Sequence, residues 1–251
     1  MVNVVKSGVA VVVMMFVVIV LIPTARGEYV AEKYQPKSGY DSYDDLNKYV
    51  IGQGLIGAAV YEDVTFRQAS KIDSSVVAEN EISSMPIIGI GGQLPMVEVG
   101  KKTVLGFDGG IAFSWRSSVS SISSANGNVK MTLDNDLYMV DVFWGGLISR
   151  YVTQKARIYG GAGPIFLFGN YWGKSKDENT VTDDVSLASE KSSAFGIGWY
   201  SRAGIEVRMA NGAFMGLGVL WQDATIDFGT SSAGKIDFDG IMPMVTCTFG
   251  F

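Results

Sequence analysis

Residues 195–221 have the sequence FGIGWYSRAGIEVRMANGAFMGLGVLW. In the first half of this stretch, apolar side chains alternate with glycine and polar side chains. The apolar positions are Phe195, Ile197, Trp199, Ala203, Ile205 and Val207, and the intervening positions are Gly196, Gly198, Tyr200, Arg202, Gly204 and Glu206. Only Ser201 interrupts the apolar series. Because successive side chains of a β-strand point to opposite faces, this period of two predicts a strand with one apolar face.

A tight turn is expected directly after this strand. The segment Met209-Ala210-Asn211-Gly212 contains an Asn-Gly pair, which suits the two-residue loop of a hairpin. The alternation then resumes, with apolar residues Met215, Leu217, Val219 and Trp221 separated by Gly216, Gly218, Leu220 and Gln222. The stretch therefore predicts an antiparallel hairpin with one apolar face and one face of glycine and polar groups.

The same alternation recurs along the chain from about residue 49. It predicts eight strands, near residues 49–62, 85–97, 103–118, 129–149, 156–172, 192–209, 213–228 and 236–251. The connections near 98–102, 150–155 and 210–212 are short, whereas those near 63–84, 119–128, 173–191 and 229–235 are longer and polar. Short turns at one end and long polar loops at the other are typical of outer-membrane barrels.

The apolar face of each strand is expected to point outward, into lipid. In a soluble sheet the apolar face points inward and the charged face meets water. Here the face opposite the apolar one is rich in glycine, which weakens strands and is a poor choice for a surface in water. Small side chains do suit the narrow interior of an eight-stranded barrel. The predicted fold is all-β: a closed antiparallel transmembrane β-barrel with short periplasmic turns and longer extracellular loops.

This orientation places several charged side chains inside the barrel. They are Asp108, Arg116, Asp141, Arg202, Glu206 and Arg208. Arg157 is a further candidate, on a strand whose register is left open by its glycines and by Pro164. Charge buried in a narrow barrel is costly unless it is paired. We therefore expect a network of salt bridges that plugs the lumen, with a conducting or gated path as the alternative.

The first residues have the order of a secretory signal peptide. Lys6 precedes the apolar run 8–22, and Ala25 and Gly27 occupy the positions of small residues before a cleavage site. The run is shorter than the roughly 20 residues that a membrane helix needs. The sequence predicts a cleaved signal peptide over 1–27, a periplasmic leader over 28–48 and a barrel over 49–251. A plug or a tether to another envelope component is the alternative for the leader.

The last strand ends on an aromatic residue in an apolar series. Every second residue back from the end belongs to this series: Phe251, Phe249, Cys247, Val245, Pro243 and Ile241. A terminal phenylalanine on such an alternation looks like the signal that outer-membrane barrels present to their insertion machinery. Pro243 lacks the N–H of a regular strand residue, so a bulge is expected there.

With the signal peptide, the eight strands and this terminus, residues 49–251 resemble the small outer-membrane barrel superfamily that includes the OmpA-like transmembrane domain and OmpX-like proteins. The resemblance implies export to the outer membrane of a Gram-negative bacterium and insertion through Phe249 and Phe251. It carries no active-site motif and so implies little about activity. Lipid A deacylases, lipid A palmitoyltransferases and outer-membrane proteases also resemble this architecture, but those families depend on a histidine, and this chain has none.

Other functions are disfavoured by composition and by the context of two motifs. A net charge of −5 disfavours nucleic acid as a partner. Residues 52–57 match the glycine pattern of dinucleotide sites, but no βαβ unit surrounds them. Residues 229–235 approach a P-loop, yet Ile236 replaces the required Ser or Thr. No cofactor and no metal is expected, and Cys247 is the only cysteine.

These observations favour a non-enzymatic barrel with a structural or surface-interaction role. The long loops near 63–84 and 173–191 are expected to contact extracellular ligands, lipopolysaccharide or other surfaces. The other expected partners are the outer-membrane lipids and the insertion machinery, through the C-terminal strand. A porin-like pore for small solutes is the competing hypothesis, and an enzyme acting on membrane lipid is the third.

Overall fold

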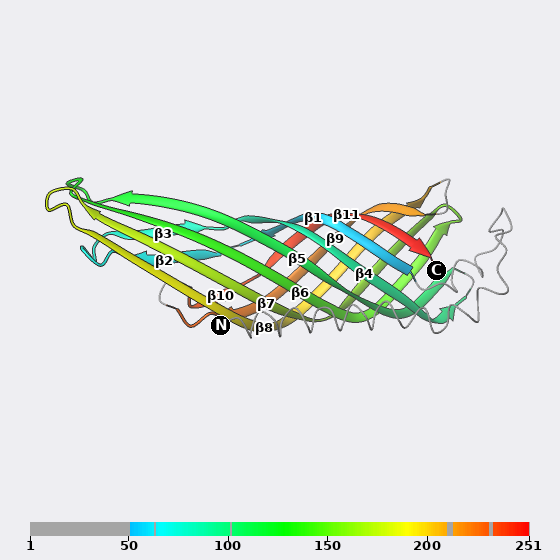
Figure 1. Ribbon diagram of the computed structural model, residues 1–251. Helices are drawn as coiled ribbons and strands as arrows, with labels where there is room; N and C mark the ends of the chain where they lie inside the picture. The colour runs from blue at the N-terminus through cyan, green and yellow to red at the C-terminus, as the bar shows by residue number, and fades with distance from the viewer. Residues whose placement is uncertain (1–50, 63, 101, 210–212, 231–232, 251) are drawn as a thin grey trace.

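The computed structural model describes residues 51–62, 64–100, 102–209, 213–230 and 233–250 (Figure 1). The strands are β1 (Ile51–Tyr61), β2 (Thr65–Ala69), β3 (Val77–Glu81), β4 (Ser84–Val99), β5 (Thr103–Ser123), β6 (Val129–Thr153), β7 (Ala156–Asn179), β8 (Val185–Arg208), β9 (Phe214–Asp227), β10 (Lys235–Asp237) and β11 (Gly240–Gly250). In this part of the chain, no helix has the length and apolar character needed to cross a membrane.

Eight of the strands close into a ring. The order of neighbours is β1-β4-β5-β6-β7-β8-β9-β11, with β11 returning to β1, and every pair is antiparallel. The first and last strands pair over most of their length, from Ile51 opposite Gly250 to Tyr61 opposite Gly240. The predicted fold class and its eight strands are therefore confirmed.

The strands of the ring differ greatly in length, so some of them extend far past the ring at one end of the barrel (Figure 1). β1 and β11 have 11 residues each, whereas β6 has 25 and both β7 and β8 have 24. Predicting loops over 119–128 and 173–191 was therefore partly wrong, because strand continues through 119–123, 173–179 and 185–191. Outside lipid a strand no longer needs an apolar face, so the apolar alternation disappears while backbone pairing continues. The predicted loop 63–84 likewise contains the hairpin of β2 and β3.

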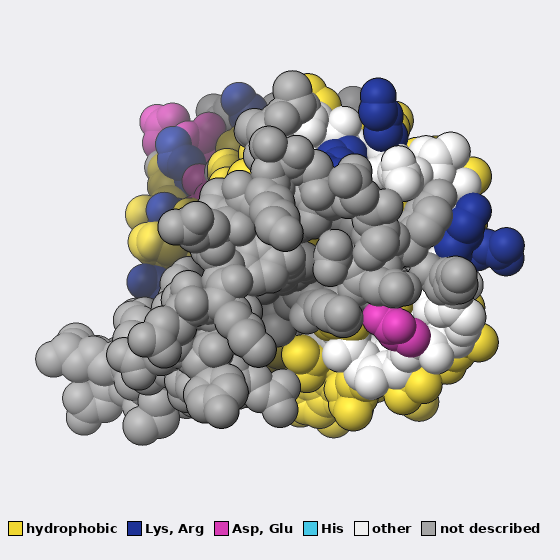
Figure 2. Space-filling model, turned by 90° about the vertical axis from the view of Figure 1, so that its right-hand side faces the viewer, with side chains coloured by type: hydrophobic (Ala, Val, Ile, Leu, Met, Phe, Trp, Pro, Cys, Tyr) yellow, Lys and Arg dark blue, Asp and Glu magenta, His cyan; other side chains and the backbone are white. Residues whose placement is uncertain are grey.

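The predicted orientation of the two faces is confirmed. Trp199 and Leu217 are 66% and 65% exposed on the outside of the wall, whereas Tyr200, Arg202 and Glu206 are buried inside. Figure 2, which looks at the end with the short turns, shows hydrophobic side chains along the outside of the wall and lysine and arginine side chains at the rim. A closed ring with apolar groups on its outer surface is the arrangement of a barrel surrounded by lipid.

The interior is more apolar than expected. Besides glycine and charge, it holds a cluster of buried apolar side chains that includes Leu55, Phe143, Ile165, Leu220 and Met244. The inner face of the wall is therefore not uniformly polar. The barrel packs its own core while its outer face remains apolar for lipid.

Glycine allows β6 and β7 to approach closely. Gly145 and Gly163 both lie on the buried side of their strands. A Cβ atom on Gly163 would collide with the carbonyl oxygen of Trp144 and with the Cα of Gly145. These strands can keep their present separation only if both positions lack a side chain.

The last strand has the predicted sides but not the predicted bulge. Ile241, Val245 and Phe249 face outward, and Phe249 is 47% exposed. Next to Pro243 the β1–β11 ladder is interrupted between the Gly57–Met244 and Val60–Ile241 pairs, yet the register is the same on both sides. Pro243 lacks a backbone N–H donor, but the strand continues past it without the extra residue of a bulge. Phe251, the Asn211-Gly212 turn, the signal peptide and the leader 28–48 lie outside the described residues.

The long ends of β5 to β8 form a sheet that continues past the ring. We call residues 115–123, 129–138, 170–179 and 185–193 the outer sheet. The β2–β3 hairpin covers its inner face, where Phe66 stacks on Tyr171 with 4.9 Å between ring centroids. Lys71 N–H donates to Asp177 Oδ2 over 2.8 Å. The outer sheet is therefore a packed element with a small core of its own.

The turn between β2 and β3 is held by a side chain. The hydroxyl and the backbone N–H of Ser75 both donate to Asp73 Oδ1, over 2.7 and 3.0 Å. These hydrogen bonds lower the pKa of the Asp73 carboxyl below its usual range. The hairpin thus carries a local constraint where it turns.

We predict that Gly163→Ala destabilises the barrel by about 1–3 kcal/mol, because the added methyl group has no space between β6 and β7. Gly146→Ala is the matched control, since a Cβ there meets nothing within 4 Å. Urea unfolding of protein refolded into lipid vesicles measures both. Equal stability of the two variants would contradict the close approach of these strands.

Candidate functional site

A bidentate ion pair crosses the interior of the barrel. Arg202 on β8 donates from Nε to Asp108 Oδ2 over 2.6 Å, and its Nη2 forms a short contact with Oδ1. Both side chains are completely buried. Tyr200, also on β8, donates its hydroxyl to Asp108 Oδ2 over 3.2 Å. The pair therefore joins β5 to β8 through the lumen, although these strands are not neighbours in the ring.

A second ion pair lies beside the first. Arg157 on β7 contacts Glu206 on β8, with Nη2 and Nε lying 2.6 and 2.7 Å from Glu206 Oε2. The side chains are 1% and 0% exposed. The other carboxylate oxygen, Oε1, accepts from the hydroxyls of Thr246 and Thr248 on β11, over 2.9 and 2.7 Å. Glu206 thus links β8 to β7 and to the last strand.

Gln53 on β1 connects the two pairs. Its Oε1 accepts from Arg202 Nη1, and its Nε2 donates to Glu206 Oε1, both over 2.8 Å. We call Gln53, Asp108, Arg157, Arg202 and Glu206 the ion-pair layer. Its two arginines and two carboxylates balance in charge, which offsets the cost of burying each one. It ties together β1, β5, β7 and β8 inside the wall.

Aromatic rings enclose the arginines of this layer. The guanidinium of Arg202 lies 5.4 Å from the centre of the Phe143 ring and 5.3 Å from that of Tyr159. That of Arg157 lies 5.6 Å from the Tyr159 ring and from the Phe214 ring. Such contacts stabilise a desolvated cation. These aromatic side chains are packed around the two guanidinium groups of the ion-pair layer.

The structure brings together only part of the charged set that the sequence suggests. Asp108, Arg202 and Glu206 meet in the layer, and so does Arg157. Arg116 lies beyond the ring on the outer sheet, where it is exposed and forms no salt bridge with a described residue. Arg208 has the inward parity but is only half-buried at the end with the short turns. Parity alone could not show how far along the barrel each charge lies.

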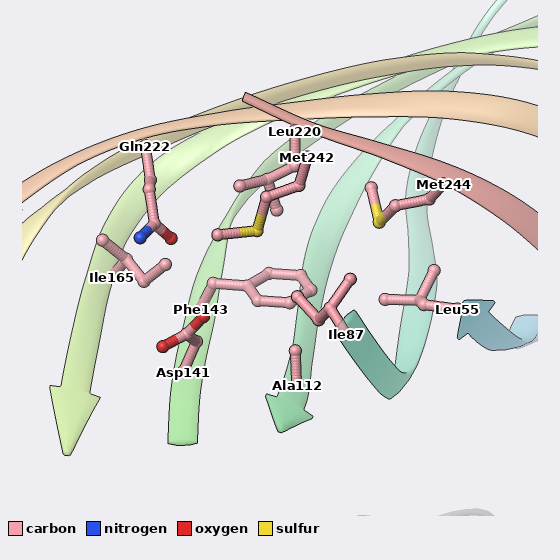
Figure 3. Close-up of a pocket in the computed structure, with 10 residues that line it drawn as sticks. All are labelled: Leu55, Ile87, Ala112, Asp141, Phe143, Ile165, Leu220, Gln222, Met242 and Met244. Atoms are coloured by element: carbon pink, nitrogen blue, oxygen red, sulfur yellow. The ribbon is translucent and has the colours of Figure 1, made fainter. Parts of the chain in front are cut away.

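Asp141 is buried in a different part of the lumen. It lines a small cavity of about 10 Å³ together with Phe143, Ile165, Gln222 and Met242 (Figure 3). Neither carboxylate oxygen of Asp141 and neither amide atom of Gln222 has a hydrogen-bond partner among the described residues. This volume is close to the minimum for one water molecule. Asp141 therefore does not belong to the ion-pair layer, contrary to the prediction that grouped them.

Sequence reasoning missed the neutral members of the site. Gln53 was not singled out, because the glycine-rich first strand gave only a weak alternation. Thr246 and Thr248 do lie on the inward parity of the last strand, so that parity was the available signal. Tyr200 was also on the polar face. A carboxylate on that face needs hydrogen-bond donors, and short hydroxyl side chains nearby could have been recognised as such.

A second candidate site is the free edge of the outer sheet along β5. The β4–β5 ladder ends at Ile87 opposite Ser114, and beyond it residues 115–123 pair with β6 alone. The opposite edge, on β8, is partly occupied, because Ser192 donates its hydroxyl to the Phe228 carbonyl over 2.5 Å. The β5 edge is therefore the more open of the two.

The backbone groups that face this edge can be identified from the register. Ser124 N–H donates to the Val129 carbonyl, and Tyr151 N–H donates to the Lys102 carbonyl. Even-numbered residues of β5 therefore bond to β6, and odd-numbered ones point the other way. Along 115–123 those are Trp115, Ser117, Val119, Ser121 and Ser123. Their N–H and C=O groups meet no backbone partner in the described part of the chain.

The strand ring and its two faces define a small eight-stranded antiparallel transmembrane barrel. Solved structures similar to this chain include Ail, the attachment invasion locus protein of Yersinia pestis, at 11% identity over 80% of this chain and 99% of that chain, with a TM-score of 0.35. Outer membrane protein OprG from Pseudomonas aeruginosa shows 13% identity over 80% of this chain and 95% of that one, with a TM-score of 0.39. Neisserial surface protein A shows 10% identity over 80% and 94%, with a TM-score of 0.31.

The likeness to these proteins concerns the fold alone. No protein-family model and no curated protein matches the sequence.

We predict that Asp108→Ala lowers the free energy of unfolding by about 3–5 kcal/mol, because it leaves the Arg202 guanidinium buried without its carboxylate. Replacing both members, Asp108→Leu with Arg202→Met, should restore most of the loss, since no buried charge is then left unpaired. Urea titration in lipid vesicles compares the three proteins. A double variant as unstable as Asp108→Ala would show that the charges act separately.

Proposed function

We propose that the protein is a non-enzymatic outer-membrane barrel that binds extracellular partners by strand addition at the β5 edge of its outer sheet. The observation that carries the proposal is a row of backbone N–H and C=O groups on the odd-numbered residues from Trp115 to Ser123. These groups point to the free edge of the sheet and lack backbone partners in the described structure. An exposed edge of this kind is a template for pairing with another strand. The partner is therefore a protein segment in extended conformation.

The side chains of the edge support this role. Natural sheets protect free edges with charged residues, with proline or with a covering element. Arg116 is the charged residue of this edge, and past it, from Ser117 to Ser123, the residues are serine, valine and isoleucine, without charge or proline. Small hydroxyl side chains leave the backbone accessible and keep the edge soluble. The edge is thus suited to temporary pairing.

The packed core of the barrel is evidence that the barrel serves as a rigid base for the outer sheet and not as a path for solutes. The ion-pair layer and the apolar cluster around Phe143 fill the interior with packed side chains. We propose that the lumen is closed and that the outer-membrane lipids, lipopolysaccharide and the insertion machinery are the remaining partners. The predicted signal peptide supplies the export route in this proposal.

We predict that Ser121→Pro abolishes strand addition without unfolding the barrel. Proline removes an N–H that points to the free edge and bonds to no neighbouring strand, which edge strands tolerate. Ser121→Ala, which keeps this N–H, is the matched control. A random decapeptide library selected against the refolded wild type supplies the ligands, and hydrogen exchange maps them. Protection should appear at the odd-numbered residues of 115–123.

The proposal would be overturned by selected peptides that protect another region, or by equal binding to Ser121→Pro and Ser121→Ala. Heat-modifiable migration in detergent gels checks that both variants are folded. Loss of binding in the alanine variant as well would assign recognition to the hydroxyl and not to the backbone.

We also predict that the refolded protein shows no steady current in planar bilayers, because buried side chains occupy the lumen. Asp108→Ala with Arg202→Ala removes the central pair and should increase leak. A steady conductance in the wild type would favour the alternative of a small-solute pore.

A further inference from the structure

Two lysines on the outer surface converge on one tryptophan. Lys191 Nζ lies 3.7 Å and Lys174 Nζ 4.2 Å from the centre of the Trp172 ring. Lys191 on β8 is directly opposite Trp172 on β7, and Lys174 follows two positions along β7. Neither lysine forms a salt bridge with a described carboxylate, although Asp134 on β6 is opposite Lys174 in the register. Two ammonium groups are thus held together without an ionic partner in the described part of the chain.

This pair of cations lies past the apolar band of the barrel, separated from it by one polar row. Along the outward side of β7, Trp172 is preceded by Asn170, Phe168 and Phe166, and on β8 Lys191 is followed by Ser193 and Phe195. The phenylalanines touch one another, with 5.1 Å between the Phe168 and Phe195 ring centroids and 5.9 Å between those of Phe166 and Phe195. The charged pair and the column of aromatic rings thus lie along one outer surface, with Asn170 and Ser193 between them.

We propose that Trp172, Lys174 and Lys191 bind a phosphate group of an anionic membrane lipid whose acyl chains lie along the phenylalanine column. Ammonium groups near the surface of a membrane attract anionic headgroups. Tryptophan at this level is typical of the boundary between the apolar band and water. Ser189 accepts from Trp172 Nε1 over 3.4 Å and can donate its own hydroxyl proton to a phosphate oxygen.

The amphipathic order of the site distinguishes a lipid from a free anion. A soluble phosphate would use only the two lysines, whereas a lipid also covers exposed apolar area on Phe168 and Phe195. The inference rests on the proposed placement of the barrel in a membrane. It concerns a different surface from the β5 edge, so the two can fail separately.

Binding of lipid A tests this site, with the folded protein in a non-ionic detergent and native mass spectrometry as the readout. Wild type should retain lipid A that carries its two phosphates at least about tenfold more tightly than dephosphorylated lipid A. Lys174→Gln with Lys191→Gln should remove this preference. The matched control is Lys130→Gln with Lys235→Gln, which changes the net charge equally on exposed residues elsewhere and should keep the preference.

Three outcomes would overturn the site. They are an unchanged preference in the Lys174/Lys191 variant, an equal loss in the control variant, and displacement of lipid A by inorganic phosphate at a similar concentration. Insertion into vesicles is measured in parallel by heat-modifiable migration. A wild type that inserts but ignores the lipid phosphates refutes the site and leaves the membrane placement standing, whereas failure to insert refutes the placement itself.

Discussion

The pairing of the first strand with the last is the constraint on which the rest of the structure depends. Inside lipid there is no water to satisfy a backbone N–H or C=O group, so a sheet can cross only if it has no free edge. The β1–β11 ladder removes both edges at once. Pro243 in this ladder lacks a donor, and the register continues through it unchanged.

Closure with eight strands also determines what the interior can hold. The two arginines and two carboxylates of the ion-pair layer are almost completely buried, so these groups must solvate one another. Gln53 and the threonines of β11 supply the hydrogen bonds that remain, and they come from the two strands that close the ring. The ion-pair layer therefore joins the closing seam to the opposite wall, and charge pairing and ring closure support each other.

Much of this architecture could be predicted from the alternation in residues 195–221, because lipid on one side and a packed lumen on the other impose a period of two. The same reasoning identified Asp108, Arg202 and Glu206 as inward-facing. It failed where lipid is absent: the outer part of β7, with Lys174 and Lys176 on its outward side, looks like a loop although it is strand. It also could not place Asp141 or Arg116 along the barrel axis, because their depth depends on the stagger between strands, which parity does not encode.

Strands β5 to β8 meet opposite requirements at their two ends. Within the ring, the backbone N–H and C=O groups of the odd-numbered residues of β5 must form hydrogen bonds with β4. This pairing extends as far as Ser114. Past that residue the chain of β4 has already turned toward the β2–β3 hairpin, which covers the inner face of the outer sheet and leaves its edge uncovered. Water can satisfy the exposed groups there, so the open edge costs little, and another strand can replace that water. The length of β5 to β8 beyond the apolar band thus gives a barrel with a closed ring of strands an open sheet edge outside that ring.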